Sequence, residues 1–204
     1  MILNHIDTPA SKEILRLNLD KLIIADKVLT DSIQLDIIGP EKFGIIGDNG
    51  VGKIRLVKEI MAASLVDYAY MPQTYAEVLD INQSPVELLA SSRNKADISK
   101  AMTHLGSLNF KVEEMQSPFK DLSGGQKAKV YFALMSLRET QLLILDEPSR
   151  NISPLSLDTL IHQLQAYQGA IIVITHNRDL FHTVFDKVYQ LSKDGLKQLA
   201  KQVY

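Results

Sequence analysis

The stretch from Gly44 to Ile60, GIIGDNGVGKIRLVKEI, combines closely spaced glycines with a lysine that begins an amphipathic segment. Such glycines let successive backbone N–H groups turn inward around phosphate oxygens, and the lysine can reach the β- and γ-phosphates of a nucleotide. The positive end of the following helix dipole would add to this attraction. The simpler alternative is a glycine-rich turn that binds nothing. The residues that we expect to contact a nucleotide here are Gly47, Asp48, Asn49, Gly50, Val51, Gly52, Lys53 and Ile54.

An acid pair, Asp146 and Glu147, follows the apolar run LLIL. At the carboxyl end of a parallel strand, Asp146 can orient Mg²⁺ through its water shell. Glu147 can then polarise an attacking water as a general base, or orient it. Two acids at a strand end are often ordinary solubilising loop residues. Because this pair follows a buried-strand pattern in a chain with a phosphate-loop motif, the catalytic interpretation is favoured.

The segment LSGGQKAKVYFAL carries a further candidate site at the start of a predicted helix. A serine hydroxyl and free backbone amides at a helix start can bind an anion, although a lone Ser-Gly-Gly is more often a flexible turn. Ala128, Tyr131 and Leu134 recur at helical spacing and support the helix. The predicted binding residues are Ser123, Gly124, Gly125 and Gln126.

Two single residues complete the candidate chemistry. The side-chain oxygen of Gln73, in YAYMPQ, can contribute to Mg²⁺ and to a catalytic water. The imidazole of His176, which ends AIIVITH, can hydrogen-bond a γ-phosphate and that water. Taken alone, the first is a loop glutamine and the second a surface histidine.

The elements that must position these residues alternate between short apolar runs and amphipathic stretches, which indicates an α/β fold. Alternation predicts antiparallel strands at the N-terminal end, and continuous apolar runs predict buried parallel strands. Between Ser84 and Leu122 the strand pattern lapses, so we expect one domain over 1–204 with a small helical subdomain inserted at about 84–138. Ser153 is a plausible cap of a helix beginning at Pro154, and the final segment SKDGLKQLAKQVY fits either a strand–turn–strand or a frayed tail. The expected strands are 13–19 and 31–38, then 42–47, 67–71, 141–146 and 170–176.

Composition limits the classes of function. The 204 residues have 46% hydrophobic content and a formal net charge of -2, which gives no basic field for nonspecific nucleic-acid binding. Cysteine is absent from the sequence, which excludes disulfides and thiolate metal sites. No apolar run approaches the roughly 20 residues that a membrane-spanning helix needs, and the first residues lack a secretory pattern. We therefore expect a cytoplasmic protein.

In order and spacing, these motifs resemble the ATP-binding cassette (ABC) ATPase domain over nearly the whole chain, and most closely one cassette of the ABC-F type. The resemblance implies a P-loop fold with a mostly parallel core sheet, ATP and Mg²⁺ as cofactors, and an ATPase activity. It also implies that Gly47–Lys53 form the Walker A loop, Gln73 the Q-loop and Ser123–Gln126 the signature. Asp146 and Glu147 correspond to the Walker B pair, and His176 to the switch histidine.

The chain departs from the family pattern at three positions. Ile54 replaces the Ser or Thr whose hydroxyl contacts Mg²⁺, and an aliphatic group cannot ligate a hard cation. Ile24 stands where an aromatic ring usually packs under the adenine, so stacking is reduced. Ser153 stands where the family has an aspartate, although its role as a helix cap explains it structurally.

In this family the signature of one domain closes over the Walker A loop of another, so the resemblance implies a second cassette as partner, in a homodimer or in the other half of a tandem protein. It further implies ATP-driven work on ribosomes. The alternatives are an ATP sensor with little turnover and a cytoplasmic ATPase subunit of a membrane transporter with a permease partner. A chromosome-maintenance ATPase would need long coiled-coil heptads between the Walker motifs, which the sequence lacks.

Overall fold

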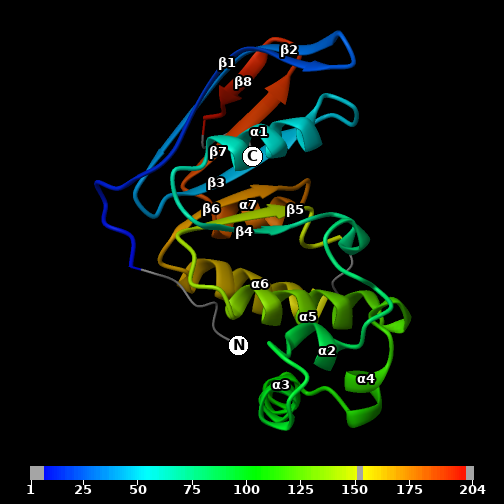
Figure 1. Cartoon of the computed structure of the whole chain (residues 1–204). Helices are drawn as coiled ribbons and strands as arrows, with labels where there is room; N and C mark the ends of the chain where they lie inside the picture. Colours follow the sequence, from blue (N-terminus) through cyan, green and yellow to red (C-terminus); the bar gives the residue numbers. More distant parts are fainter. Residues whose placement is uncertain (1–6, 151–153, 201–204) are drawn as a thin grey trace.

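A mostly parallel sheet forms the centre of the molecule (Figure 1). The structure is a computed structural model that describes residues 7–150 and 154–200. Within these residues the central sheet has six strands in the order β4-β5-β6-β3-β7-β8, and all pairs are parallel except β7 with β8. The strands are β3 (Lys42–Gly47), β4 (Tyr68–Met71), β5 (Leu142–Asp146), β6 (Ala170–Ile174), β7 (Lys187–Ser192) and β8 (Gly195–Gln198).

The central strands are buried on both faces, as their continuous apolar runs predict. Successive side chains of a strand point to opposite faces, so Leu143 and Leu145 join one core and Leu142 and Ile144 the other. The first core is closed by α5 (Gly124–Ser136), α6 (Pro154–Ala166) and α7 (Arg178–Thr183). The second is closed by α1 (Lys53–Ala63) and a two-stranded hairpin. Because parallel strands end at a common edge, the segments after β3, β5 and β6 converge there.

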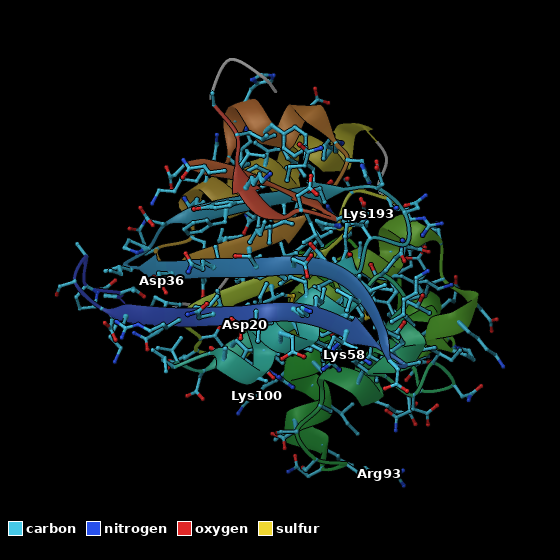
Figure 2. All side chains as sticks on the ribbon, turned by 90° about the horizontal axis from the view of Figure 1, so that it is seen from above. Asp20, Asp36, Lys58, Arg93, Lys100 and Lys193 are labelled. Atoms are coloured by element: carbon cyan, nitrogen blue, oxygen red, sulfur yellow. The ribbon has the colours of Figure 1, made fainter. Side chains whose placement is uncertain are left out.

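The hairpin consists of β1 (Glu13–Ile24) and β2 (Lys27–Ile38), which pair antiparallel. Its turn residues, Ala25 and Asp26, have φ of 45° and 64°, the positive values that a two-residue type I′ turn requires. The side chain of Thr30 bonds to the β7–β8 turn, where its Oγ1 donates to the carbonyl of Ser192 and accepts from Gly195 N at 3.0 Å. Figure 2 looks down on this layer, with Asp20 and Asp36 on its polar outer face.

The helical region extends away from the sheet below α5 (Figure 1). It contains α2 (Pro85–Leu89), α3 (Lys95–Ser107) and α4 (Val112–Gln116), with short 3₁₀ turns at Tyr75–Glu77 and Phe119–Asp121. These helices share a third apolar cluster, which α5 joins through Val130 and Ala133. The opposite side of α5 packs against the sheet, and the Tyr131 hydroxyl donates to the Tyr70 carbonyl on β4 at 2.7 Å. Helix α5 therefore connects the helical region to the central sheet.

The predicted fold class is confirmed, and the differences concern single elements. The N-terminal strands are longer than expected and meet in a tight turn at Ala25 and Asp26. In the C-terminal segment, residues 192–200 have the strand–turn–strand form, and residues 201–204 lie outside the described residues. The first strand, β7, begins at Lys187, before the segment that the sequence indicated. The predicted cap Ser153 lies outside the described residues. Helix α6 starts at Pro154, as expected. None of the helices in 7–150 and 154–200 has the length and apolarity needed to cross a bilayer.

Candidate functional site

The glycine-rich loop joins the buried strand β3 to α1 at the carboxyl edge of the sheet. Helix α1 starts at Lys53 and is capped by Gly52, whose φ of 107° lies in the left-handed region. A Cβ at Gly52 would lie 2.9 Å from methyl carbons of Leu22 and Leu29 on the hairpin. The left-handed backbone conformation therefore favours glycine at this position, and a side chain there would also displace the two leucine methyl groups of the hairpin. As at the start of any α-helix, the first backbone N–H groups of α1 have no hydrogen-bond partner within the helix.

The Lys53 ammonium group lies over the loop from which it starts. Its Nζ donates to the carbonyl oxygens of Gly47 at 2.6 Å and Asp48 at 3.1 Å. It also lies 3.3 Å from Nε2 of His176. Because an ammonium group can only donate, the last contact requires an unprotonated Nε2 on the histidine. The lysine thus connects the loop after β3 to the segment after β6.

Glu147 lies beside this pair with a strained backbone. Its φ is 50°, which is uncommon for a residue with a side chain. Its N–H donates to the Ile174 carbonyl at 2.8 Å, which fixes the end of β5 to the end of β6. Its Oε1 lies 3.7 Å from His176 Nε2. Strain of this kind is found most often at functional sites, where the surrounding structure holds it in place.

The segment after β6 is fixed by a buried hydroxyl. Thr175 is fully buried, and its Oγ1 accepts the backbone N–H of Asn177 at 3.0 Å. The Thr175 N–H donates to the Ile45 carbonyl on β3 at 3.2 Å. His176 stands between these anchored residues with its own side chain exposed. Its backbone is therefore held while its imidazole stays accessible.

Asp146 is the buried member of the acid pair, with 6% of its surface exposed. Burial raises its pKa to about 6, and the neighbouring Glu147 charge adds to this rise, whereas the Lys53 charge opposes it. The ionised carboxylate of Asp146 is therefore less stable here than in water, and added positive charge would stabilise it. Gln73, which follows β4, lines the same cavity and brings a neutral amide to it.

Lys53, Gln73, Asp146 and Glu147 line one cavity of about 350 Å³, and His176 lies beside it without lining it. The hairpin tip closes one side of it: Ile24 and Lys27 pair across the turn, and Ile24 is 47% exposed. Ile54, in the first turn of α1, is 57% exposed and lines the cavity as well. The cavity is lined by Ile24, Lys27, Leu29, Asn49, Gly50, Gly52, Lys53, Ile54, Arg55, Gln73, Asp146 and Glu147.

The segment Ser123–Gln126 does not line this cavity. It lies at the start of α5, with Ser123 as the cap: Ser123 Oγ accepts from Gln126 N at 3.3 Å, and Ser123 N donates to Gln126 Oε1 at 2.8 Å. Both Ser123 and the start of the helix are accessible. Within one chain, the two groups of residues predicted to bind anions, the loop before Lys53 and the segment Ser123–Gln126, therefore do not line the same cavity.

Most predicted site residues come together at one edge of the sheet, and sequence reasoning missed three residues in the cavity. Lys27, Leu29 and Arg55 line it without having been predicted. The alternating residues on either side of the short segment AD could have indicated a hairpin, and hence the position of Lys27 and Leu29. Arg55 follows Ile54 in the first helical turn and forms an ion pair with Glu59, so its pattern is that of an ordinary helix surface.

Comparison with solved structures supports the fold. The chain superposes with a TM-score of 0.70 on a dimeric ATP-binding cassette in a post-hydrolysis state bound to ADP and phosphate, at 14% identity, covering 92% of this chain and 98% of that one. A nucleotide-free ATP-binding cassette from an ABC transporter gives a TM-score of 0.67 at 17% identity, covering 94% of each chain.

Comparison with known sequences supports the family. ABC transporter F family member 5 of Arabidopsis thaliana is 30% identical over 86% of this chain and 27% of its own length. The ATP-binding protein Uup of Buchnera aphidicola is 28% identical over 96% of this chain and 36% of its own length. The chain thus spans only about a quarter to a third of the length of these relatives. Residues 30–150 match the family described as ABC transporter. This chain belongs to the ABC transporter family as an ATP-binding cassette of the ABC ATPase type, and the relatives named above include members of its F group.

Proposed function

We propose that this chain binds ATP in the cavity beside Lys53 and, in a sandwich with a second cassette, hydrolyses it to ADP and phosphate to drive a conformational change in a partner. The observation that carries the proposal is the convergence of Lys53, Glu147 and His176 at the edge of the cavity. The His176 Nε2 lies 3.3 Å from the Lys53 Nζ and 3.7 Å from the Glu147 Oε1. A cation, a carboxylate and an imidazole at one edge are groups that phosphoryl transfer to water can use.

The polyphosphate would bind at the loop between β3 and α1. Lys53 has two neutral backbone carbonyls and one imidazole nitrogen as partners, and no carboxylate among its hydrogen-bond acceptors. A phosphate oxygen forms a charge-assisted bond with an ammonium group, which is stronger than a bond to a neutral carbonyl. The lysine would therefore exchange the carbonyls of Gly47 and Asp48 for phosphate oxygens, beside the unpaired N–H groups of the helix start.

The attacking water would be held by Glu147. Its backbone bond to Ile174 fixes the start of the side chain, and His176 lies 3.7 Å from its carboxylate. Glu147 would accept a proton from the water or orient it. Once Lys53 has turned to the phosphate, the His176 imidazole, in the tautomer with its proton on Nε2, would donate to the terminal phosphate. Gln73 would contribute its amide oxygen at the same end of the cavity. The hairpin tip, through Ile24, would pack against the base.

The acid pair fits a divalent cation only in part. Among the described residues, no group of three or more His, Cys, Asp or Glu could hold a metal by itself. Mg²⁺ would therefore be bound by Asp146, Gln73, waters and the phosphates, which is its usual arrangement with a nucleotide. The raised pKa of Asp146 fits this role, because an added cation would stabilise the ionised carboxylate. When bound, Mg²⁺ would neutralise charge on the phosphates.

Ile54 is where the fit fails. A side chain in the first turn of α1, exposed in the cavity, is where a hydroxyl would meet the metal, and isoleucine has no oxygen to offer. Loop amides and Lys53 do not depend on this residue, so binding should persist when Mg²⁺-dependent turnover is reduced. This observation favours a second candidate, an ATP sensor that holds nucleotide with little hydrolysis.

A second cassette is the partner that the geometry favours. Ser123–Gln126 lie outside the cavity, so a facing chain would have to supply this segment to the nucleotide. That chain would be a second copy or the other half of a tandem protein, which fits the length of the relatives. A ribosome as the object of the work, and a cytoplasmic location, rest on the ABC-F relatives alone. A membrane permease as partner is the less favoured alternative.

The first experiment measures nucleotide binding. Titration calorimetry with ATP and with ADP, with and without Mg²⁺, is expected to give saturable binding that Lys53→Ala weakens by about tenfold or more, as expected for the loss of one charge-assisted phosphate contact. Phosphate release, with a competent second cassette supplied, separates an ATPase from a sensor. Absence of saturable binding at millimolar nucleotide would contradict the proposal.

Replacing Ile54 with Thr should raise Mg²⁺-dependent turnover, since the hydroxyl supplies the missing metal contact. Ile54→Val is the matched control, because valine has the shape of threonine without its oxygen. We expect a severalfold increase in the rate of phosphate release for Thr and no increase for Val. Equal rates for the two variants would show that the missing hydroxyl does not limit turnover.

Replacing Asp146 with Asn should stabilise the nucleotide-free chain above pH 6 while reducing the effect of Mg²⁺ on ATP binding. The native pKa is about 6 and the unperturbed value 3.8, so the parent loses stability as pH rises between these values. The variant avoids this loss, which we expect to be about 1–2 kcal/mol at pH 8. Urea unfolding at pH 8 and at pH 4.5 tests it, and a stability difference that grows on acidification would contradict the prediction.

Replacing Gly125 with Ala should separate stability from activity. A Cβ at Gly125 meets no atom within 4 Å, so the chain's own fold accommodates it. Alanine in a helix is favoured over glycine by about 0.5–1 kcal/mol, so thermal stability should not fall. A methyl group between the helix start and a facing phosphate should lower turnover by on the order of tenfold to a hundredfold. Gly106→Ala, in α3, where the nearest side-chain atom lies at 3.8 Å, is the control. Unchanged turnover in Gly125→Ala would argue against a role for this glycine.

A further inference from the structure

A single carboxylate, that of Glu114, connects the starts of two helices. Its Oε2 accepts the Lys111 N–H at 2.8 Å at the start of α4. Its Oε1 accepts from Nε2 of Gln126 at 2.7 Å, near the start of α5. Gln126 in turn accepts the Ser123 N–H on its Oε1 at 2.8 Å. The chain of hydrogen bonds therefore runs from α4 through two side chains to the backbone of the segment Ser123–Gln126.

The chemistry of Glu114 determines which way the Gln126 amide faces. A carboxylate only accepts hydrogen bonds, so it must face the NH₂ of an amide and not its oxygen. The Gln126 oxygen is then directed to the Ser123 N–H, as the 2.8 Å distance requires. If the amide were reversed, its NH₂ would face the Ser123 N–H, donor against donor. The orientation of Gln126 thus depends on its partner in α4.

Capping of α4 alone does not account for this arrangement. One carboxylate oxygen is enough to accept the Lys111 N–H, and the other reaches a residue twelve positions further along the chain. The adjacent Glu113 also lies in the first turn of α4, but it is exposed. The bond from Gln126 to Glu114 is partly buried, where an unpaired group costs more than at the surface.

We propose that Glu114 is a positioning residue for the segment Ser123–Gln126, acting through the Gln126 amide. It fixes the Ser123 backbone so that the N–H groups of Gly124 and Gly125, which the start of a helix leaves without partners inside it, keep one direction. This inference rests on the proposed function, in which a facing cassette's nucleotide meets these groups. It adds a residue of α4 that contacts no nucleotide itself.

Exchanging the two side chains gives a sharp test. In Glu114→Gln, the amide oxygen takes the Lys111 N–H, so the new NH₂ faces the Gln126 NH₂, donor against donor. Gln126 must then turn its oxygen toward α4, and the Ser123 N–H loses its acceptor. In Gln126→Glu, two carboxylates face each other. The double variant Glu114→Gln with Gln126→Glu places a carboxylate on α5 that accepts both from Ser123 and from the new amide on α4. The oxygen of that new amide accepts from Lys111, so all the hydrogen bonds are restored with donor and acceptor exchanged.

The first measurement requires no nucleotide. Amide hydrogen exchange of Ser123, followed by NMR on the full chain, should be faster by about tenfold in Glu114→Gln, as expected when a protecting hydrogen bond is lost. Glu113→Gln removes a charge from the same helical turn without touching Gln126, and should leave the rate unchanged. The double variant should return the rate to that of the parent. Equal rates in Glu114→Gln and Glu113→Gln would overturn the proposal.

The second measurement is turnover with a second cassette supplied. Glu114→Gln should lower kcat by about tenfold with an unchanged affinity for ATP at the chain's own loop, since the signature acts on the facing nucleotide. Glu113→Gln should match the parent. The double variant keeps a carboxylate at Gln126, a predicted binding residue, so its turnover should exceed that of Gln126→Glu alone without having to reach that of the parent. A double variant no better than Gln126→Glu alone would overturn the positioning role. If the parent neither binds nor hydrolyses ATP, the proposed function fails, whereas the exchange measurement still decides whether Glu114 orients Gln126.

Discussion

The contact between the Lys53 ammonium group and the carbonyls of its own loop is the interaction on which the candidate site depends. It fixes a positive charge at the edge of the sheet where β5 ends at Asp146 and continues into Glu147, and it brings that charge within 3.3 Å of His176 Nε2. The hydrogen-bond partners that hold this charge are neutral, so an anion can compete for it without breaking an ion pair. The loop is thus folded around its lysine and is still available to a phosphate.

The order of the strands brings the other groups to that charge. Strand β3 lies between β6 and β7, and β5 lies next to β6, so the segments after β3, β5 and β6 leave the sheet side by side. Two bonds hold them together there: Glu147 N–H to the Ile174 carbonyl, and Thr175 N–H to the Ile45 carbonyl. The hairpin adds a third contact, where Leu22 and Leu29 meet Gly52. Geometry within the site is therefore set by backbone pairing more than by side-chain packing.

Sequence reasoning locates groups that lie close together along the chain and misses groups that meet only in space. The loop around Lys53, the acids after β5 and the capped start of α5 at Ser123 are local patterns, and each was predicted. Lys27 enters the cavity only because a tight turn brings β2 back over α1, and strand β7 is recognisable mainly by its pairing with β3. The bond between Glu114 and Gln126 spans α4 and α5, and no spacing rule points to it.

The glycines and Ile54 separate what the fold requires from what a ligand requires. Gly52 is favoured by the chain itself, since its backbone is left-handed and a side chain there would displace two leucine methyl groups of the hairpin. Gly125 has open space around it, and Ile54 is more than half exposed, so packing within the chain dictates neither residue. Because Ile54 is exposed, its aliphatic side chain contributes little to stability through burial. In the proposed function, it occupies the position from which a hydroxyl would reach a cation. In that function, the identity of residue 54 would therefore bear on how the site binds a metal, whereas phosphate binding would rest on the loop and on Lys53.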